Sequence, residues 1–533
     1  MSQGQTGWTL QGGSVIGGAS RPGDGEAFYG HDPATGERLE PVYRSASMAD
    51  LQVAAGMAEE AFAVYGGLPG RERARLLRTI ADNLEAMAPE LVERAQRETA
   101  LPAARLKGES ARTIGQLRLF AQVVEEGSWV QARIDPAQPE RKPLPRCDIR
   151  SMMRPLGPVA VFGASNFPLA FSVAGGDTAA ALAAGNPVLV KGHPAHPGTS
   201  ELVGMAIARS VQACGLPAGV FALLIAAGTE LGGALVEHPS VNAVGFTGSL
   251  AAGRALMALA AARPEPIPCF MEMSSVNPVF VLPEALKARG AQIAGGLFGS
   301  FTLGAGQFCT KPGLIFLPRG AEADALVAEL KAQVEKAGAA VMLTQGIARN
   351  YGAGIAARQA QSGVETVATG AEAATGAACA TPVVMQTDGD AFLSEPELGT
   401  EVFGPVTMVI RYGSGDELPG LARALEGQLT ATLHGTDADL AACGDLITIL
   451  ERKAGRLIVN GYPTGVEVCH AMVHGGPYPA TSDGRSTSVG TYSIYRFARP
   501  VCYQDFPEAA LPEELREGNP LGIWRMVDGE LTR

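Results

Sequence analysis

Residues 157–163, Gly-Pro-Val-Ala-Val-Phe-Gly, form a short apolar run with glycine at both ends. Such a run is typical of a parallel strand that is buried on both faces. Three further apolar runs follow it, at 187–191, 220–225 and 243–246, and each gap leaves room for a helix. Strands and helices that alternate in this way predict a doubly wound parallel sheet. The fold class is therefore α/β.

Polar residues follow three of these predicted strands. Asn166 comes after the first, Lys191 ends the second, and Thr247-Gly248-Ser249 follows the fourth. Because open parallel sheets bind ligands at the carboxyl ends of their strands, these residues are candidates for ligand contacts. No GxGxxG motif follows any of the four strands, but Thr-Gly-Ser at the start of a helix can still hold a pyrophosphate on backbone amides.

Composition restricts the possible partners and compartments. The net charge of −12 and the lack of a dense Lys/Arg run argue against nucleic acid. Apolar stretches are interrupted well before the ~20 residues that a membrane span needs, and the first residues do not resemble a secretory signal. The 8 cysteines are scattered without a CxxC pair, as expected in a reducing cytoplasm. We expect a cytoplasmic protein without a membrane partner.

The stretch Gly304-Ala-Gly-Gln-Phe-Cys-Thr310 places a cysteine on a predicted backbone bend. A cysteine on such a bend can act as a nucleophile, although free cysteines are also often buried and merely structural. A second candidate is Glu272, whose neighbours are apolar, a setting that favours a raised pKa and a role as a base. His193 and His196 lack a third ligand, so we expect no metal site there.

Several motifs in fixed order resemble the aldehyde dehydrogenase superfamily over nearly the whole chain. They are Ser165-Asn-Phe-Pro168, Phe246-Thr-Gly-Ser249, Glu272, Gly306-Gln-Phe-Cys-Thr310 and Glu401-Val-Phe-Gly-Pro405. The resemblance implies a Rossmann-like parallel-sheet cofactor domain, an α/β catalytic domain and a small β oligomerisation arm. The implied boundaries are 1–135 and 155–275 for the NAD(P)-binding domain, 276–470 for the catalytic domain, 136–154 and 485–505 for the arm, and 506–533 for a C-terminal tail.

The resemblance also implies a role for each matching residue. Cys309 would attack the aldehyde carbon, Asn166 and the backbone N–H of Cys309 would hold the oxyanion, and Glu272 would activate the water that hydrolyses the thioester. The cofactor would be contacted by Lys191, His193, Gly248, Ser249, Glu401 and Phe403.

Within the superfamily, residues 163–177 and 191–200 resemble the branch of α-ketoglutaric semialdehyde dehydrogenases. This branch forms a dicarboxylate, so the substrate carboxylate should meet a cation, for which Arg112 is the candidate. Phe167 and Phe171 are the other predicted substrate contacts. The family's usual Lys-Pro-Ser-Glu is Lys191-Gly-His-Pro194 here. A glutamate at the last of these positions would repel a 2′-phosphate. Its absence makes NADP the expected cofactor and NAD the alternative.

Two other interpretations remain open at this stage. One is a broad-specificity or fatty aldehyde dehydrogenase that uses NADP on the same scaffold. The other is a relative that keeps the fold but has lost catalysis, which the presence of Cys309, Glu272 and Asn166 disfavours. A CoA-acylating enzyme is also disfavoured, because it does not need a hydrolytic base. The extended segment 141–150 and the predicted strand near Tyr492 suggest a homodimer or homotetramer formed by strand exchange.

Overall fold

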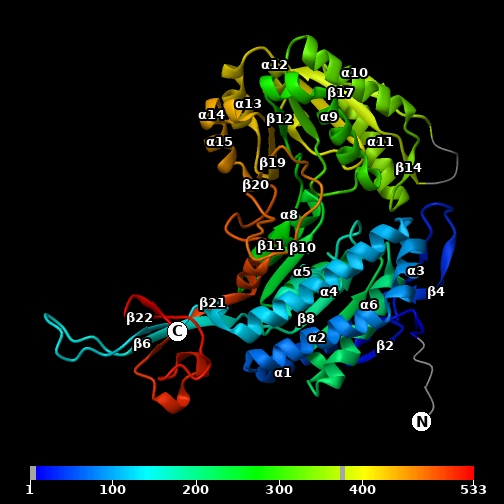
Figure 1. Cartoon of the computed structure of the whole chain (residues 1–533). Helices are drawn as coiled ribbons and strands as arrows, with labels where there is room; N and C mark the ends of the chain where they lie inside the picture. Colours follow the sequence, from blue (N-terminus) through cyan, green and yellow to red (C-terminus); the bar gives the residue numbers. More distant parts are fainter. Residues whose placement is uncertain (1–7, 373–377) are drawn as a thin grey trace.

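The computed structural model describes residues 8–372 and 378–533. Its two α/β parts lie one above the other in Figure 1, and a narrow arm of strands projects from the lower part. The lower part holds most of the chain before residue 275, and the upper part holds α9 to α15.

The first sheet has seven strands in the order β11-β10-β7-β8-β9-β1-β2. All four apolar runs predicted to be strands are strands: β7 (Val159–Phe162), β8 (Val188–Gly192), β9 (Phe221–Ile225) and β10 (Ala243–Thr247). They pair in parallel. The remaining members are β11 (Cys269–Glu272), which is parallel to β10, and the antiparallel β1 (Ser14–Ile16) and β2 (Ala19–Arg21).

Helices cover both faces of this sheet, because successive strand residues point to opposite sides. Val159 and Val161 face a cluster built from one group of helices: α2 (Gly70–Ala86), α4 (Ala103–Glu126), α5 (Gly176–Ala184) and α6 (Pro197–Ala213). Ala160 and Phe162 face the other group: α1 (Met48–Tyr65), α7 (Glu230–Glu237) and α8 (Leu250–Ala262). The sheet is thus buried on both faces, as its apolar sequence predicts.

Helices α1 to α4 precede β7 in the chain. Ser47 caps α1 in a reciprocal capping box with Asp50, which explains why the helix begins there. The helical spacing of alanine and leucine over 71–98 predicts a single helix, but the structure has two there, α2 and α3 (Ala88–Thr99), with a break at Met87. Met87 is fully buried and continues the apolar spacing, so the sequence pattern does not reveal this break.

The second sheet also has seven strands, in the order β15-β17-β18-β13-β12-β19-β20. In chain order these are β12 (Val279–Val281), β13 (Leu314–Pro318), β15 (Glu365–Thr369), β17 (Val383–Asp388), β18 (Val406–Tyr412), β19 (Gln428–His434) and β20 (Ala454–Val459). Phe280 and Phe316 stack with ring centroids 4.5 Å apart at its centre. Its helices are α9 (Pro283–Thr302), α10 (Ala321–Lys336), α11 (Gln345–Gln359), α12 (Gly389–Ser394), α13 (Leu418–Ala424), α14 (Asp437–Ala442) and α15 (Gly444–Glu451).

The arm contains β5 (Arg133–Asp135), β6 (Ile149–Pro155) and β21 (Ala498–Gln504), with β21 antiparallel to β6. The strand predicted over 492–501 begins later, since 491–497 form a 3-10 helix. The tail adds β22 (Arg525–Val527) and β23 (Glu530–Thr532) to the same sheet, in the order β21-β6-β5-β22-β23. Leu511, Leu515 and Ile523 anchor the tail by packing into the core beneath it.

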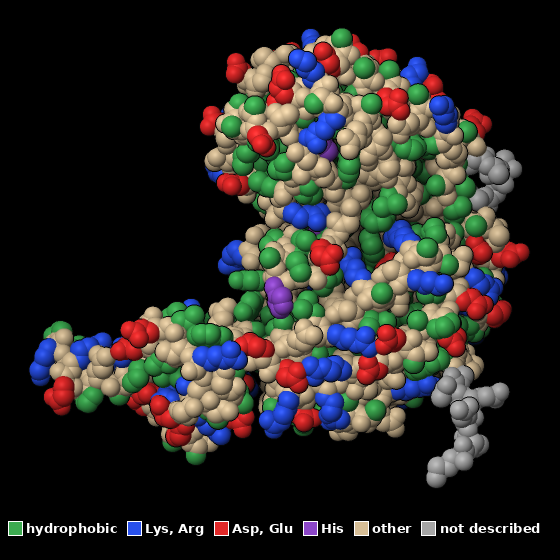
Figure 2. Space-filling model, viewed as in Figure 1, with side chains coloured by type: hydrophobic (Ala, Val, Ile, Leu, Met, Phe, Trp, Pro, Cys, Tyr) green, Lys and Arg blue, Asp and Glu red, His purple; other side chains and the backbone are tan. Residues whose placement is uncertain are grey.

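Two remaining observations concern the surface. The face in Figure 2 carries interspersed Lys/Arg and Asp/Glu side chains, on the arm as well as on the two larger parts. Among residues 8–372 and 378–533, none of the helices is long and apolar enough to cross a membrane.

Candidate active site

Cys309 lies on a tight bend between α9 and β13. Gly304, Ala305 and Gly306 all have positive φ angles, 57°, 58° and 65°. A Cβ at Gly306 would lie 2.3 Å from the backbone of Gly404, so glycine is required where this loop meets the Glu401–Pro405 segment. Cys309 itself is half-buried, which leaves its thiol able to meet a ligand.

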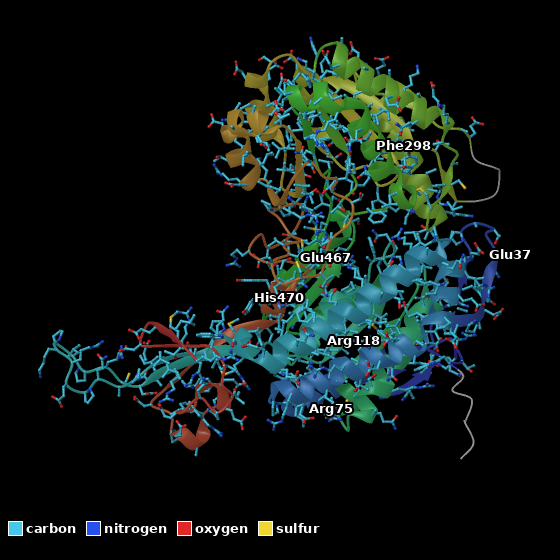
Figure 3. All side chains as sticks on the ribbon, viewed as in Figure 1. Glu37, Arg75, Arg118, Phe298, Glu467 and His470 are labelled. Carbon is cyan, nitrogen blue, oxygen red and sulfur yellow. The ribbon has the colours of Figure 1, made fainter. Side chains whose placement is uncertain are left out.

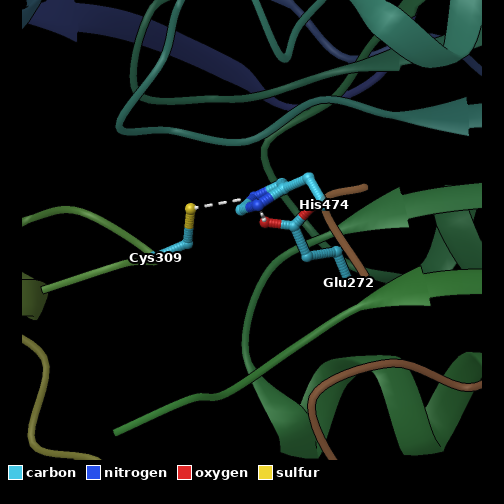
Figure 4. A group of neighbouring side chains, drawn as sticks. All are labelled: Glu272, Cys309 and His474. Atoms are coloured by element: carbon cyan, nitrogen blue, oxygen red, sulfur yellow. Dashed lines mark hydrogen bonds and ion pairs between the residues drawn. The ribbon is translucent and has the colours of Figure 1, made fainter. Parts of the chain in front are cut away.

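A histidine that the sequence did not indicate joins the predicted nucleophile to the predicted base. Nε2 of His474 lies 3.5 Å from Sγ of Cys309 and 2.9 Å from Oε1 of Glu272. Figure 4 shows the imidazole between the other two side chains. Glu272 ends β11, Cys309 precedes β13 and His474 follows β20, so three segments that are distant in sequence meet here.

The surroundings of Glu272 correct the prediction of a raised pKa. Burial does raise the pKa of this carboxyl, but the charge of His474 and hydrogen bonds from His474, Ser488 and Cys309 outweigh burial, and the net pKa is lowered. The Ser488 hydroxyl donates to Oε2 of Glu272 over 2.5 Å. Sequence neighbours suggested an apolar setting, whereas the partners that stabilise the charge come from residues 474 and 488. Glu272 is therefore ionised at neutral pH.

The pKa of Cys309 is shifted in the opposite direction. Burial raises the pKa of its thiol well above the ordinary value, and the negative charge of Glu272 raises it further, while Arg112 opposes the shift. The resting residue is a thiol that must lose its proton before it can attack. The adjacent Glu272–His474 pair is positioned to accept that proton.

Asn166 lies directly against the cysteine loop. Its Nδ2 donates to the carbonyl of Gln307 over 3.0 Å, while its own carbonyl accepts from Arg105 over 2.7 Å. The structure thus brings the side-chain amide of Asn166 to the loop whose backbone was predicted to share the oxyanion with it.

Phe167, Phe171 and Phe308 form an aromatic wall beside these residues. The ring of Phe167 is edge-on to both Phe171 and Phe308, with centroids 5.4 and 5.2 Å away. The ring of Phe171 also lies 6.2 Å from that of His474. Phe167 and Phe171, the two predicted aromatic substrate contacts, therefore lie beside the predicted reacting groups.

Arg112, on α4, points toward the same wall. Its guanidinium lies over the ring of Phe171, 5.1 Å from the centroid. Nε and Nη2 are buried and have no hydrogen-bond partner within the described part of the chain. Burial lowers the pKa of Arg112, whereas Cys309, Glu109, Glu272 and Glu467 raise it. The free N–H groups of a buried guanidinium can donate to a substrate carboxylate.

The predicted adenosine end of the cofactor site is at the carboxyl end of β8. Nζ of Lys191 donates to the carbonyl of Ala226, and burial lowers the pKa of Lys191 to about 8. His193 stacks on His196 with centroids 5.5 Å apart. Burial and the nearby His196 and Lys191 lower the pKa of His193 well below its ordinary value. Lys191 thus supplies the positive charge here, and His193 supplies only a neutral ring.

The predicted pyrophosphate contacts lie at the start of α8. Gly248 and Ser249 are exposed, and Ser249 caps the helix by accepting from the backbone N–H of Ala252. A Cβ at Gly248 would come within 2.5 Å of the Phe246 ring, so the close turn needs glycine. Gly248 also donates its N–H to the carbonyl of Glu272, which links this turn to the base. The exposed N-terminus of α8 at this turn is suited to a pyrophosphate.

Glu401 and Phe403 lie on the segment that meets the cysteine loop, and Lys311 joins the two. Nζ of Lys311 donates to the carbonyls of Val402 and Val406 over 3.1 and 3.0 Å. Burial raises the pKa of Glu401 to about 7, and Lys311 opposes this rise. Lys311 immediately follows Thr310, so it connects the loop of the predicted nucleophile, Cys309, to the segment that carries the predicted ribose-binding carboxylate, Glu401. Motif matching did not identify it.

Asn277 is a further residue that the sequence did not reveal. Its Nδ2 donates to the carbonyls of both Cys309 and Lys311, over 2.8 and 3.0 Å. Its Oδ1 accepts from Ser275 and Thr430. Asn277 has a positive φ of 46°. This backbone conformation is visible in the structure but is not marked by any sequence motif.

Comparison with known proteins agrees with this geometry. The model of the aldehyde dehydrogenase family matches residues 21–495. The chain is 53% identical over 522 residues to alpha-ketoglutaric semialdehyde dehydrogenase 2 of Azospirillum brasilense, covering 98% of this chain and 99% of that protein. It is 49% identical over 493 residues to alpha-ketoglutaric semialdehyde dehydrogenase of Acinetobacter baylyi, covering 92% of this chain and 93% of that protein.

Solved structures show the same fold at lower identity. Gamma-glutamyl-gamma-aminobutyraldehyde dehydrogenase from Burkholderia cenocepacia superposes with a TM-score of 0.80 at 24% identity, covering 93% of this chain and 97% of that chain. Similarity at this level supports the architecture alone.

Proposed function

Because the chain belongs to the aldehyde dehydrogenase family and is an aldehyde-oxidising oxidoreductase, we propose that it oxidises α-ketoglutaric semialdehyde to 2-oxoglutarate with NADP or NAD. The observation that carries the choice of substrate is the buried guanidinium of Arg112, which lies near Cys309 with free donors. The identity to two α-ketoglutaric semialdehyde dehydrogenases supports the same choice.

In the first half of the proposed reaction, Cys309 loses its thiol proton to the Glu272–His474 pair. Sγ then forms a bond to the aldehyde carbon, and the carbonyl oxygen becomes an oxyanion. Asn166 and the backbone N–H of Cys309 stabilise this charge, a contribution of ~2.7–4 kcal/mol per donor in acyl-transfer sites. The thiohemiacetal becomes a thioester on Cys309 when its oxyanion re-forms the C=O bond and its C–H hydride leaves, and a nicotinamide held at this site would accept that hydride.

In the second half, water cleaves the thioester. Once the Glu272–His474 pair has released the thiol proton to solvent, Glu272 is again ionised and its carboxylate can take a proton from the attacking water. The water oxygen bonds to the acyl carbon, the C–S bond breaks, and Cys309 leaves as a thiolate that takes back a proton. The aromatic wall of Phe167 and Phe171 limits access of other nucleophiles to the acyl group.

For the substrate, the test is replacement of Arg112 with Leu. We expect KM for α-ketoglutaric semialdehyde to rise roughly 10–100-fold, since hydrogen bonds to charged groups contribute about 1.5–3 kcal/mol. KM for an unsubstituted alkanal of similar length should stay within about threefold, because an alkanal has no carboxylate to lose. Steady-state kinetics with both aldehydes measures the difference.

Arg118→Leu is the matched control. Arg118 lies on the same helix, is labelled in Figure 3, and is exposed in ion pairs with Asp82 and Glu85. Its loss should leave both KM values unchanged. An equal rise in KM for both aldehydes in Arg112→Leu would instead mean that Arg112 only supports packing. Activity that rises steadily with alkanal chain length in the unmodified enzyme would favour a fatty aldehyde dehydrogenase.

For the cofactor, we propose a preference for NADP. Position 194 is a proline where the family usually has a glutamate, and the charge of Lys191 lies at the same strand end. With a pKa of about 8, Lys191 is mainly protonated at pH 7 and loses its charge as the pH rises. We expect kcat/KM for NADP to exceed that for NAD at pH 7, and Lys191→Met to reduce the ratio roughly tenfold or more. A strong preference for NAD contradicts the proposal.

For assembly, we propose a cytoplasmic homo-oligomer that uses the arm. β21 is an edge strand of the arm's sheet, and an unpaired edge of seven residues is suited to strand addition by a second copy of the chain. The mainly extended arm also projects away from the rest of its own chain (Figure 1).

A further inference from the structure

We propose that Glu272, Cys309 and His474 also form a zinc-binding site, through which Zn²⁺ inhibits the enzyme reversibly. One carboxylate oxygen, one sulfur and one imidazole nitrogen lie within 4.8 Å of one another. All three are zinc ligands, and three protein ligands with a fourth position open to water are a common zinc arrangement. The inference depends on this ligand set and not on the choice of aldehyde.

The spacing of the ligand atoms is close to what zinc requires. In a tetrahedral site with ordinary bond lengths, sulfur and nitrogen ligands lie about 3.5 Å apart, and nitrogen and oxygen ligands about 3.3 Å apart. The structure has 3.5 Å between Sγ and Nε2 and 2.9 Å between Nε2 and Oε1. The second of these distances must widen by about 0.4 Å, while Sγ and the carboxylate oxygen lie within 4.8 Å of each other. A small side-chain rotation is sufficient.

The groups behind these ligands keep them in place. Ser488 donates to the outer oxygen of Glu272 and thereby leaves Oε1 to face the site. The backbone N–H of His474 donates to Thr487, and Asn277 holds the carbonyl of Cys309. Hydrogen bonds of this kind orient metal ligands. In the resting enzyme Nε2 of His474 donates to Glu272. Nδ1 has no hydrogen-bond partner within the described residues, so the ring proton can move to Nδ1 when zinc binds the Nε2 lone pair.

Zinc binding is a ligand exchange and not a redox reaction. The S–H bond of Cys309 breaks, its proton goes to solvent, and a Zn–S bond forms, while zinc remains Zn²⁺. Zinc binding should therefore release the thiol proton of Cys309. The nucleophile is then unavailable, so turnover stops until a chelator removes the metal.

The test measures binding without turnover. Zn²⁺ is partitioned between the full-length protein and a chromophoric chelator, and a pH indicator records proton release. We expect one tight site per chain, and Cys309→Ala or His474→Ala should each weaken it at least ~100-fold. Co²⁺ in place of Zn²⁺ should produce a thiolate-to-metal charge-transfer band that Cys309→Ala abolishes. EDTA should restore the activity of zinc-treated enzyme.

Two variants serve as matched controls. His470→Ala removes an exposed histidine four positions before His474, and Cys502→Ser removes an exposed thiol on the arm. Figure 3 shows His470 on the segment between the two larger parts. Neither change should alter the tight site. Unchanged zinc affinity in both Cys309→Ala and His474→Ala would overturn the proposal. Failure of aldehyde oxidation alone would not, because binding is measured separately.

Discussion

Glu272→Gln is expected to let one acyl group form on Cys309 and then to slow its release. The amide keeps the shape of the carboxylate but cannot take a proton from water, and general base catalysis contributes roughly 10²–10⁴-fold. Rapid mixing should show a burst of reduced cofactor of about one per active site. The steady-state rate after the burst should fall by at least ~100-fold, and intact-mass spectrometry should show the acyl adduct.

The location of the adduct and the size of the burst separate the alternatives. Peptide mapping should place the added mass on Cys309, and Cys309→Ser should give neither burst nor adduct. Cys269→Ser, which removes a half-buried thiol three residues before Glu272, should behave as the unmodified enzyme. A Glu272→Gln enzyme that turns over at the normal rate would exclude Glu272 as the base. A wild-type enzyme with neither burst nor turnover would support a binding protein that has lost catalysis.

The parts of the fold that sequence predicted are those where local pattern and burial agree. The strands at 159–162, 188–192, 221–225 and 243–247 are apolar throughout because helices cover both faces. The tail strands β22 and β23 could not be predicted in the same way. All three residues of β23 are exposed, so no pattern of buried residues predicts a strand there. β23 is a strand only because it pairs with β22 at the edge of the arm's sheet.

The candidate site was predictable where a residue carries its signal in a local motif. Cys309, Asn166 and Glu401 each lie in a recognisable stretch, and the structure brings Asn166 and the Glu401 segment against the cysteine loop. His474 lies 165 positions from Cys309, in a segment without regular structure, and its role depends on a contact. The pKa of Glu272 was mispredicted for the same reason, since its deciding partners are His474 and Ser488.

These contacts make His474→Ala the second informative change. The variant removes the largest influence that lowers the pKa of Glu272, while burial, which raises that pKa, remains. The carboxylate should therefore protonate at higher pH, and the acid limb of the kcat/KM profile should move upward. Cys309 also loses the imidazole 3.5 Å from its sulfur. We expect kcat/KM for the aldehyde to fall roughly 100-fold at pH 7 and to recover partly at higher pH.

His474→Gln distinguishes proton transfer from simple support. Its side-chain amide can donate to Glu272 but cannot carry a proton from the thiol, so kcat/KM should stay within about tenfold of the alanine variant. Alkylation of Cys309 by iodoacetamide, measured against pH, should likewise require higher pH in both variants. If Gln restores both the rate and the alkylation profile, His474 only positions Glu272. An unchanged alkylation profile in His474→Ala excludes any effect of this histidine on the thiol, and His470→Ala should match the unmodified enzyme throughout.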